Sequence, residues 1–101
     1  MTSPVRILIT GAGSGLGRAI ALAWARRGAR VLIADIAQVR SEETVALCMA
    51  AGATEASFLP LDIRQEADFQ NARSWLEQHW HGVDIVVNNA GVAGGGNFDG
   101  I

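Results

Sequence analysis

Short apolar runs alternate with amphipathic stretches along the whole chain. The runs are rich in leucine and β-branched residues, and they span 5–10, 30–35, 56–62 and 84–89. This composition is typical of strands that are buried on both faces, as parallel strands are. Pro60 interrupts the third run, which makes it the weakest of the four strand predictions.

The three stretches between these runs have the spacing of amphipathic helices. Their apolar residues mostly stand three or four positions apart, so that each helix has one apolar stripe. A glycine stands where each helix should end, at positions 28, 52 and 82. The predicted stripes are Leu16, Ile20 and Trp24 in the first helix, Val45, Cys48 and Met49 in the second, and Phe69, Ala72, Leu76 and Trp80 in the third.

The order βαβαβαβ predicts an α/β fold, a doubly wound parallel sheet with helices on both faces. In such sheets, ligands bind at the carboxyl ends of the strands. Asp84 begins the fourth run, so it is expected at the opposite edge and is excluded from any site. The polar residues at the carboxyl ends are Thr10, Asp35, Asp62, Asn88 and Asn89.

The segment "TGAGSGLG" (10–17) joins the first strand to the first helix. Gly11 permits a sharp turn, and Gly15 and Gly17 lack side chains where a backbone or a ligand must come close. The N–H groups and the dipole of the helix start favour an anion such as a pyrophosphate. The glycines fit the spacing GxxxGxG rather than the commoner GxGxxG. A tight strand–helix turn without a ligand is the alternative.

Asp35 strengthens the prediction of a dinucleotide site. It ends the second strand, 24 residues after Gly11. This is near the ~20 expected for an acid that binds the hydroxyls of an adenosine ribose. A 2′-phosphate at ~4 Å would be repelled by about 4 kcal/mol at an effective dielectric constant of ~20. Neither "ADIAQ" (34–38) nor the glycine turn itself contains a lysine or arginine to offset this repulsion. The sequence therefore predicts NAD rather than NADP.

Composition narrows the remaining classes of function. The chain has 101 residues, of which 50% are hydrophobic and 18% charged, so it is long enough for one small globular domain. A net charge of −2 without a long basic patch argues against a nucleic-acid partner. The apolar runs are too short to span a bilayer, so no membrane partner is expected. The single cysteine, Cys48, excludes an internal disulfide and a CxxC metal site, which favours a cytoplasmic location.

Four motifs in register resemble the N-terminal half of a short-chain dehydrogenase/reductase: "TGAGSGLG", Asp35, "LDI" (61–63) and "NNAG" (88–91). The resemblance covers essentially all 101 residues. It implies a Rossmann-type sheet and hydride transfer between NAD(H) and an alcohol or carbonyl substrate. It also implies which residues bind each part of the cofactor. The pyrophosphate and nicotinamide ribose would contact Gly11, Ser14, Gly15, Leu16 and Gly17. The adenosine ribose would contact Asp35 and Ile36, the adenine would contact Asp62 and Ile63, and Asn89, Ala90 and Gly91 would border the adenosine ribose and the nicotinamide side.

The two asparagines have a physical interpretation of their own. An amide carries both donors and acceptors. Asn88 and Asn89 can therefore tie the end of the fourth strand to neighbouring backbone near Thr10. For Asn88 we favour this purely structural role, whereas Asn89 could also face the cofactor.

The family's catalytic tyrosine, lysine and serine would lie beyond residue 101, and the chain contains no tyrosine and no lysine. No catalytic residue is therefore assigned, since His79 and His81 are expected to cap a helix end and Cys48 to lie in the core. Residues 1–101 are expected to be a truncated NAD-binding half domain, incomplete at its C-terminal side and inactive alone. Its fourth strand would be an exposed edge that could pair with another copy.

Two other interpretations stay open. A stand-alone nucleotide-binding or pairing module would act by completing its sheet with a partner chain. A methyltransferase-type fold also uses a glycine-rich turn and an acid after the second strand. That fold usually has an acid before the first glycine, where this chain has Thr10, and it lacks "NNAG".

Overall fold

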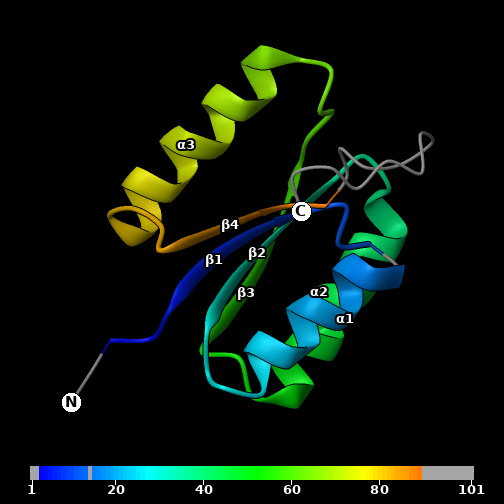
Figure 1. The fold of residues 1–101 in the computed structure, drawn as a ribbon, viewed down its shortest axis with the longest axis vertical. Coiled ribbons are helices and arrows are strands. Elements are labelled where there is room, and N and C mark those ends of the chain that lie inside the picture. Colours follow the sequence, from blue (N-terminus) through cyan, green and yellow to red (C-terminus); the bar gives the residue numbers. More distant parts are fainter. Residues whose placement is uncertain (1–2, 14, 90–101) are drawn as a thin grey trace.

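The computed structural model describes residues 3–13 and 15–89. Within these ranges the chain forms a four-stranded sheet and three helices, and the predicted α/β fold is confirmed (Figure 1). All pairs of neighbouring strands are parallel, in the order β3-β2-β1-β4. The elements are β1 (Arg6–Thr10), α1 (Gly15–Ala25), β2 (Arg30–Asp35), α2 (Gln38–Ala51), β3 (Glu55–Pro60), α3 (Glu66–Trp80) and β4 (Ile85–Asn88).

The strand order explains why the sheet is covered on both faces. The chain moves outward from β1 to β2 and β3, and then returns across the sheet to β4. Because crossovers between parallel strands are right-handed, the reversal of direction moves the connecting helix to the other face. Helices α1 and α2 therefore lie together on one face, and α3 lies on the opposite face (Figure 1). The reversal falls between β1 and β4, where doubly wound sheets open a crevice for a ligand.

The two central strands fill both layers of the core. In β1, Ile7 and Ile9 pack toward α1 and α2, whereas Leu8 packs toward α3, and β2 alternates in the same way. Burial on both faces is thus confirmed for these strands. The same prediction is wrong for β3 and β4, which lie at the sheet edges and are only partly buried. Val86 of β4 is 57% exposed.

The buried stripe of α1 lies one residue further along than predicted. It consists of Gly17, Ala21 and Ala25, whereas Leu16 is 60% exposed and the other two predicted residues pack at its margin. Small side chains face the sheet because α1 starts directly from the glycine turn and therefore runs close to the sheet. The larger side chains then flank the contact rather than fill it.

The predicted apolar stripe is confirmed for α3 and partly wrong for α2. In α3, Ala72, Leu76 and Trp80 are buried as predicted. In α2 the buried residues are Ser41, Thr44 and Cys48, and Met49 is exposed, contrary to prediction. Burial raises the pKa of the Cys48 thiol. The stripe of α2 includes Thr44 because its hydroxyl has a bonding partner on α1, Arg18, which the apolar pattern does not show.

Element ends follow local backbone chemistry. Strand β3 ends at Pro60, two residues earlier than predicted, and β4 spans four residues rather than six. Gly52 caps α2 in the left-handed conformation, with φ 119°. His81 caps α3 with φ 60°, one residue before the predicted glycine. His79 stacks on Trp75 and its Nδ1 lies 2.9 Å from the carbonyl oxygen of that residue, so the helix-end role of both histidines is confirmed.

An ion pair fastens the amino-terminal edge of the sheet, opposite the predicted site. The guanidinium of Arg6 binds both carboxylate oxygens of Asp84, with a shortest N–O distance of 2.8 Å. Arg6 also donates to the carbonyl oxygens of Trp80 and His81 at the end of α3. The hydrogen bonds from Arg6 lower the pKa of Asp84 from the usual 3.8 to about 2. Asp84 is therefore a structural residue, as its exclusion from the site requires.

This lowered pKa predicts acid sensitivity. An acid whose pKa is lower in the folded state stabilises the fold above its unfolded pKa and loses that contribution as the pH falls. The contribution of Asp84 should be complete above about pH 4 and vanish as the pH falls through about 2. Thermal unfolding of Asp84→Asn and Arg6→Met between pH 6 and pH 2 should therefore show a flatter pH dependence than the parent chain. Parallel curves for all three proteins would contradict the assignment.

Candidate functional site

The glycine turn lies at the carboxyl edge of the sheet, between β1 and α1. Gly11 has φ 68° and donates its N–H to the carbonyl oxygen of Ala34 at 2.8 Å, which fixes the turn to β2. A Cβ at Gly17 would lie 2.8 Å from the carbonyl carbon of Gly11 and closer still to its oxygen. This close approach of helix and turn accounts for the glycine at position 17.

Gly15 serves a different purpose from Gly17. Its φ of 62° favours glycine, yet a Cβ there would meet no atom of the described residues within 4 Å, its chain neighbours aside. As far as residues 3–13 and 15–89 are concerned, the space over this part of the turn is open. A ligand can approach the backbone at the start of α1, where the helix dipole favours an anion.

Asp35 ends β2 with its carboxylate held over the turn. One oxygen, Oδ2, accepts the N–H of Gly13 at 3.0 Å, and the other, Oδ1, accepts the N–H of Ala37 at 3.1 Å. An ionised carboxylate has about four acceptor positions. Two positions therefore stay available, one on each oxygen, which suits the two neighbouring hydroxyls of a ribose.

Large apolar side chains are exposed around this same edge. Leu16 is 60%, Ile36 69% and Ile63 38% exposed. They follow β1, β2 and β3 respectively, so they come from three different connections. Exposed apolar side chains that gather at one edge are suited to a flat apolar group such as an adenine ring.

Asp62 has a partner that sequence reasoning missed. Arg64 binds its carboxylate through Nε and Nη2, at 3.0 and 2.9 Å, and also donates its backbone N–H. The hydrogen bonds from Arg64 lower the pKa of Asp62. Three of about four acceptor positions are then used, which leaves one on Oδ2 for another donor. The predicted contact with the adenine amino group needs one.

The asparagines tie the end of β4 to β1 and the glycine turn. Asn89 binds backbone, as predicted, whereas Asn88 binds a side chain. The hydroxyl of Thr10 lies 2.9 Å from Asn88 Oδ1, in the position to donate to it. Asn89 donates from Nδ2 to the carbonyl oxygen of Gly11 at 3.2 Å. Asn88 thus has the structural role that was favoured for it. Of the other predicted site residues, Ser14, Ala90 and Gly91 lie outside the described residues.

Three further residues, one in the turn and two on the helices, hold the backbone of the turn in place. None of them was predicted as a site residue. Gly13 is buried against Asp35, and its carbonyl oxygen accepts from Arg18 Nη2 at 2.8 Å. Arg18 in turn donates through Nε to the hydroxyl of Thr44 at 2.9 Å. The prediction of NAD depends on the absence of lysine and arginine from residues 34–38 and from the glycine turn, whereas Arg18, the next residue on α1, bonds back to the turn. No signal within either segment could have indicated this contact.

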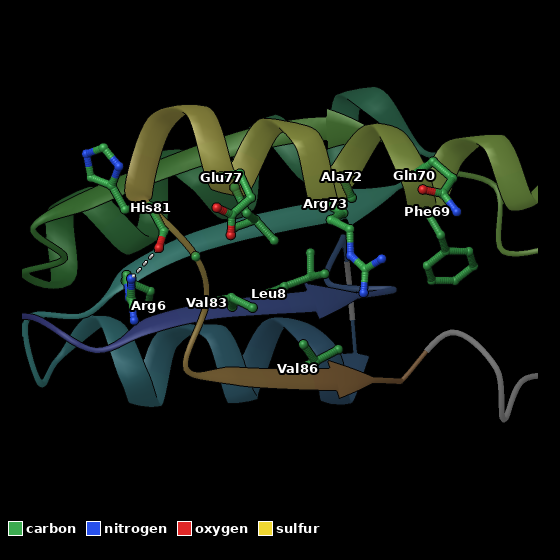
Figure 2. A pocket seen from close by; sticks show the side chains of 12 residues that line it. Arg6, Leu8, Phe69, Gln70, Ala72, Arg73, Glu77, His81, Val83 and Val86 are labelled. Carbon is green, nitrogen blue, oxygen red and sulfur yellow. Dashed lines mark hydrogen bonds between the residues drawn. The ribbon is translucent and has the colours of Figure 1, made fainter.

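A cavity of about 660 Å³ lies away from this edge, between α3 and the strands β1 and β4 (Figure 2). Leu8, Phe69 and Val86 line it, and Arg73 and Glu77 point toward it from α3 (Figure 2). None of the predicted cofactor-binding residues that the structure describes belongs to its lining.

None of the helices within residues 3–13 and 15–89 has the length and the apolar character that a helix needs to span a bilayer.

Sequence comparison identifies the family. The sequence model for short chain dehydrogenases matches residues 5–101. The chain belongs to this family. An uncharacterised oxidoreductase of Thermotoga maritima is 42% identical over 93 residues, which are 92% of this chain and 36% of that protein. Human epidermal retinol dehydrogenase 2 is 38% identical over 92 residues, which are 91% of this chain and 30% of that protein.

A solved structure agrees with this membership. The crystal structure of a short-chain type dehydrogenase/reductase from Mycobacterium marinum superposes with a TM-score of 0.77 at 28% identity. The match covers 83% of this chain and 34% of that one. The chain therefore spans about a third of the length of these relatives. The family generally uses NAD(P) and acts on small molecules.

Proposed function

We propose that this chain is the NAD(H)-binding half domain of a dehydrogenase of this family, residues 1–101. The observation that carries the proposal is the Asp35 carboxylate, which lies over the glycine turn with one acceptor position left on each oxygen. Bound NAD would supply hydride transfer to or from an alcohol or carbonyl substrate. The chain's own residues would hold the cofactor rather than carry out proton transfer, since the sequence contains no tyrosine and no lysine.

Different described residues fit the pyrophosphate, the ribose and the adenine of the adenosine diphosphate group. The open space at Gly15, next to the start of α1, suits the pyrophosphate. Asp35 and the exposed Ile36 suit the ribose, and Asp62 beside the exposed Ile63 suits the adenine. We carry over the family role of Gly11, Ser14, Leu16, Gly17, Asn89, Ala90 and Gly91 to this chain on the same proposal.

NAD is proposed over NADP because of the charge at the ribose. The Asp35 carboxylate would repel a 2′-phosphate. Arg40 lies beside Gly13 through its Cβ, and the residue is exposed. Arg18 reaches the turn itself, but its Nε and Nη2 are already bound to Gly13, Arg40, Thr44 and Glu43. Its ion pair with Glu43, at 3.2 Å, balances the charge locally. We also propose the cytoplasm as the location, where Cys48 would stay reduced.

Calorimetric titration of the purified chain with NAD, NADH and NADPH tests the proposal. We expect saturable heat with NAD and NADH, and affinity for NADPH at least about tenfold weaker than for NADH. We also expect no oxidation of an alcohol panel by the chain with NAD. Absence of heat with NAD and NADH would refute the binding role, and turnover by the chain would refute the division between binding and proton transfer.

A second candidate is a pairing module that completes its sheet with another copy. Two observations favour it: β4 pairs with β1 alone among the described strands, and Val86 is 57% exposed beside the cavity of Figure 2. Exposed edge strands bind other strands, and a lysine on the edge suppresses this. Sedimentation velocity should show dimers at high concentration and a monomer for Val86→Lys. A monomeric parent chain at all concentrations would remove this candidate.

A further inference from the structure

Gly13 is held from both sides of its Cα. Its N–H donates to Asp35 Oδ2 at 3.0 Å, and its carbonyl oxygen accepts from Arg18 Nη2 at 2.8 Å. The contact with Asp35 is also tight sterically, because a Cβ on Gly13 would lie 2.9 Å from Asp35 Oδ2. A shift of Gly13 must therefore move one oxygen of the Asp35 carboxylate.

Arg18 is anchored by α2 as well as by the turn. Its Nε donates to the Thr44 hydroxyl at 2.9 Å, and Nη2 also reaches the carbonyl oxygen of Arg40 at 3.0 Å. Thr44 is fully buried. Its hydroxyl has one proton to donate, and the carbonyl oxygen of Arg40, at 3.1 Å, is closer than that of Gly13, at 3.4 Å. Arg18 is thus the main donor to the Gly13 carbonyl, and Thr44 orients its guanidinium.

We propose that Arg18, oriented by Thr44, is a positioning residue that sets the direction of the Asp35 carboxylate toward the ribose. This inference rests on the proposed NAD-binding function. Arg18 reaches Asp35 through one residue, Gly13, and its guanidinium bonds inward to the turn and to α2. The alternative role is a plain brace between α1 and α2. Its ion pair with Glu43, whose side chain is 59% exposed, is worth little for stability.

The two roles differ in what they do to ribose recognition. A brace affects the amount of folded protein, so its loss weakens every ligand in the same proportion. A positioning residue affects the hydrogen bonds to the ribose hydroxyls selectively. The informative quantity is therefore the ratio of the Kd for ADP-ribose lacking the adenosine 2′-hydroxyl to the Kd for ADP-ribose. A hydrogen bond to a charged acceptor should make this ratio roughly 10- to 100-fold in the parent chain.

Calorimetry with these two probes tests the inference. In Arg18→Met we expect the ratio to fall to within about threefold of 1, and in Thr44→Val to an intermediate value. Arg18→Lys keeps a charged donor and should recover part of the ratio, which a lost brace would not explain. In NMR spectra of the free protein, the chemical shift of the Gly13 amide proton, which binds Asp35 Oδ2, should change in Arg18→Met.

Matched controls separate the inference from general damage. Thr54→Val removes a hydroxyl that binds a glycine carbonyl, Gly28 at 2.6 Å, at the opposite end of the sheet. Arg30→Met removes an ion pair of similar length, 3.3 Å to Glu55. Both should keep the parent ratio. If Arg18→Met and Thr44→Val kept the Kd ratio of the parent chain while Asp35→Asn abolished it, the positioning role alone would be overturned. A ratio of 1 in the parent chain would overturn the proposed function together with it.

Discussion

Replacing Gly17 by alanine is expected to lower the free energy of unfolding by about 3 kcal/mol, a large fraction of what a small domain has. The added methyl group would collide with the backbone carbonyl of Gly11 and come within 2.9 Å of the Cα of Ala12. Those atoms cannot rotate away as a side chain could, because Gly11 is bonded to Ala34 in the adjacent strand. Either α1 lifts from the turn or the turn leaves the sheet. Urea unfolding followed by circular dichroism measures the loss.

Gly15→Ala is the matched control for this prediction. It adds the same methyl group to the same first turn of α1, but a Cβ there meets no atom within 4 Å in the part of the chain that the structure describes, its chain neighbours aside. Its cost comes from the left-handed φ of 62° alone, which is about 1 kcal/mol for an alanine. Equal urea midpoints for the two variants would show that the close approach of α1 to the turn does not decide the glycine at position 17.

The fold was predictable where a residue's environment depends on its near neighbours in sequence. Ile7, Leu8 and Ile9 form a continuous apolar run because both faces of β1 are covered, and such a run indicates a central parallel strand. The stripe of α1 was not predictable in this way. Apolar periodicity selects the largest side chains, such as Leu16, whereas the distance from helix to sheet here requires the smallest, such as Ala21.

The candidate site was also predictable only where its signals are local in the sequence. The glycine turn and Asp35 are local signals, because backbone conformation and the end of a strand can be inferred from a few residues. The supports of the site are contacts over longer distances, such as the bond of Arg18 to Thr44, and no local pattern marks them. Asn89 is an intermediate case. Its amide predicted a bond to nearby backbone, and the topology decided that this backbone is Gly11.

Replacing Asp35 by alanine is expected to weaken the binding of NAD by roughly 100-fold, through the loss of two hydrogen bonds from ribose hydroxyls to a charged acceptor. The affinity for NADP should rise at the same time, because the repulsion of the 2′-phosphate disappears. The preference between the two cofactors should therefore vanish or reverse. Calorimetric titration of the parent chain and the variant with both cofactors measures all four affinities.

Two further variants isolate the charge from the structural role of this acid. Alanine also deprives the N–H groups of Gly13 and Ala37 of their two acceptor oxygens, whereas Asp35→Asn keeps the shape of the side chain and one acceptor oxygen for one of these N–H groups. The asparagine variant should therefore be less destabilised than the alanine variant and still lose most of the preference for NAD. Asp84→Asn removes an acid that accepts a backbone N–H at the opposite edge of the sheet, and it should leave both affinities unchanged. If Asp35→Asn kept the parent preference, selection against the 2′-phosphate would have to come from another part of the turn, and Asp35 would serve only to hold Gly13.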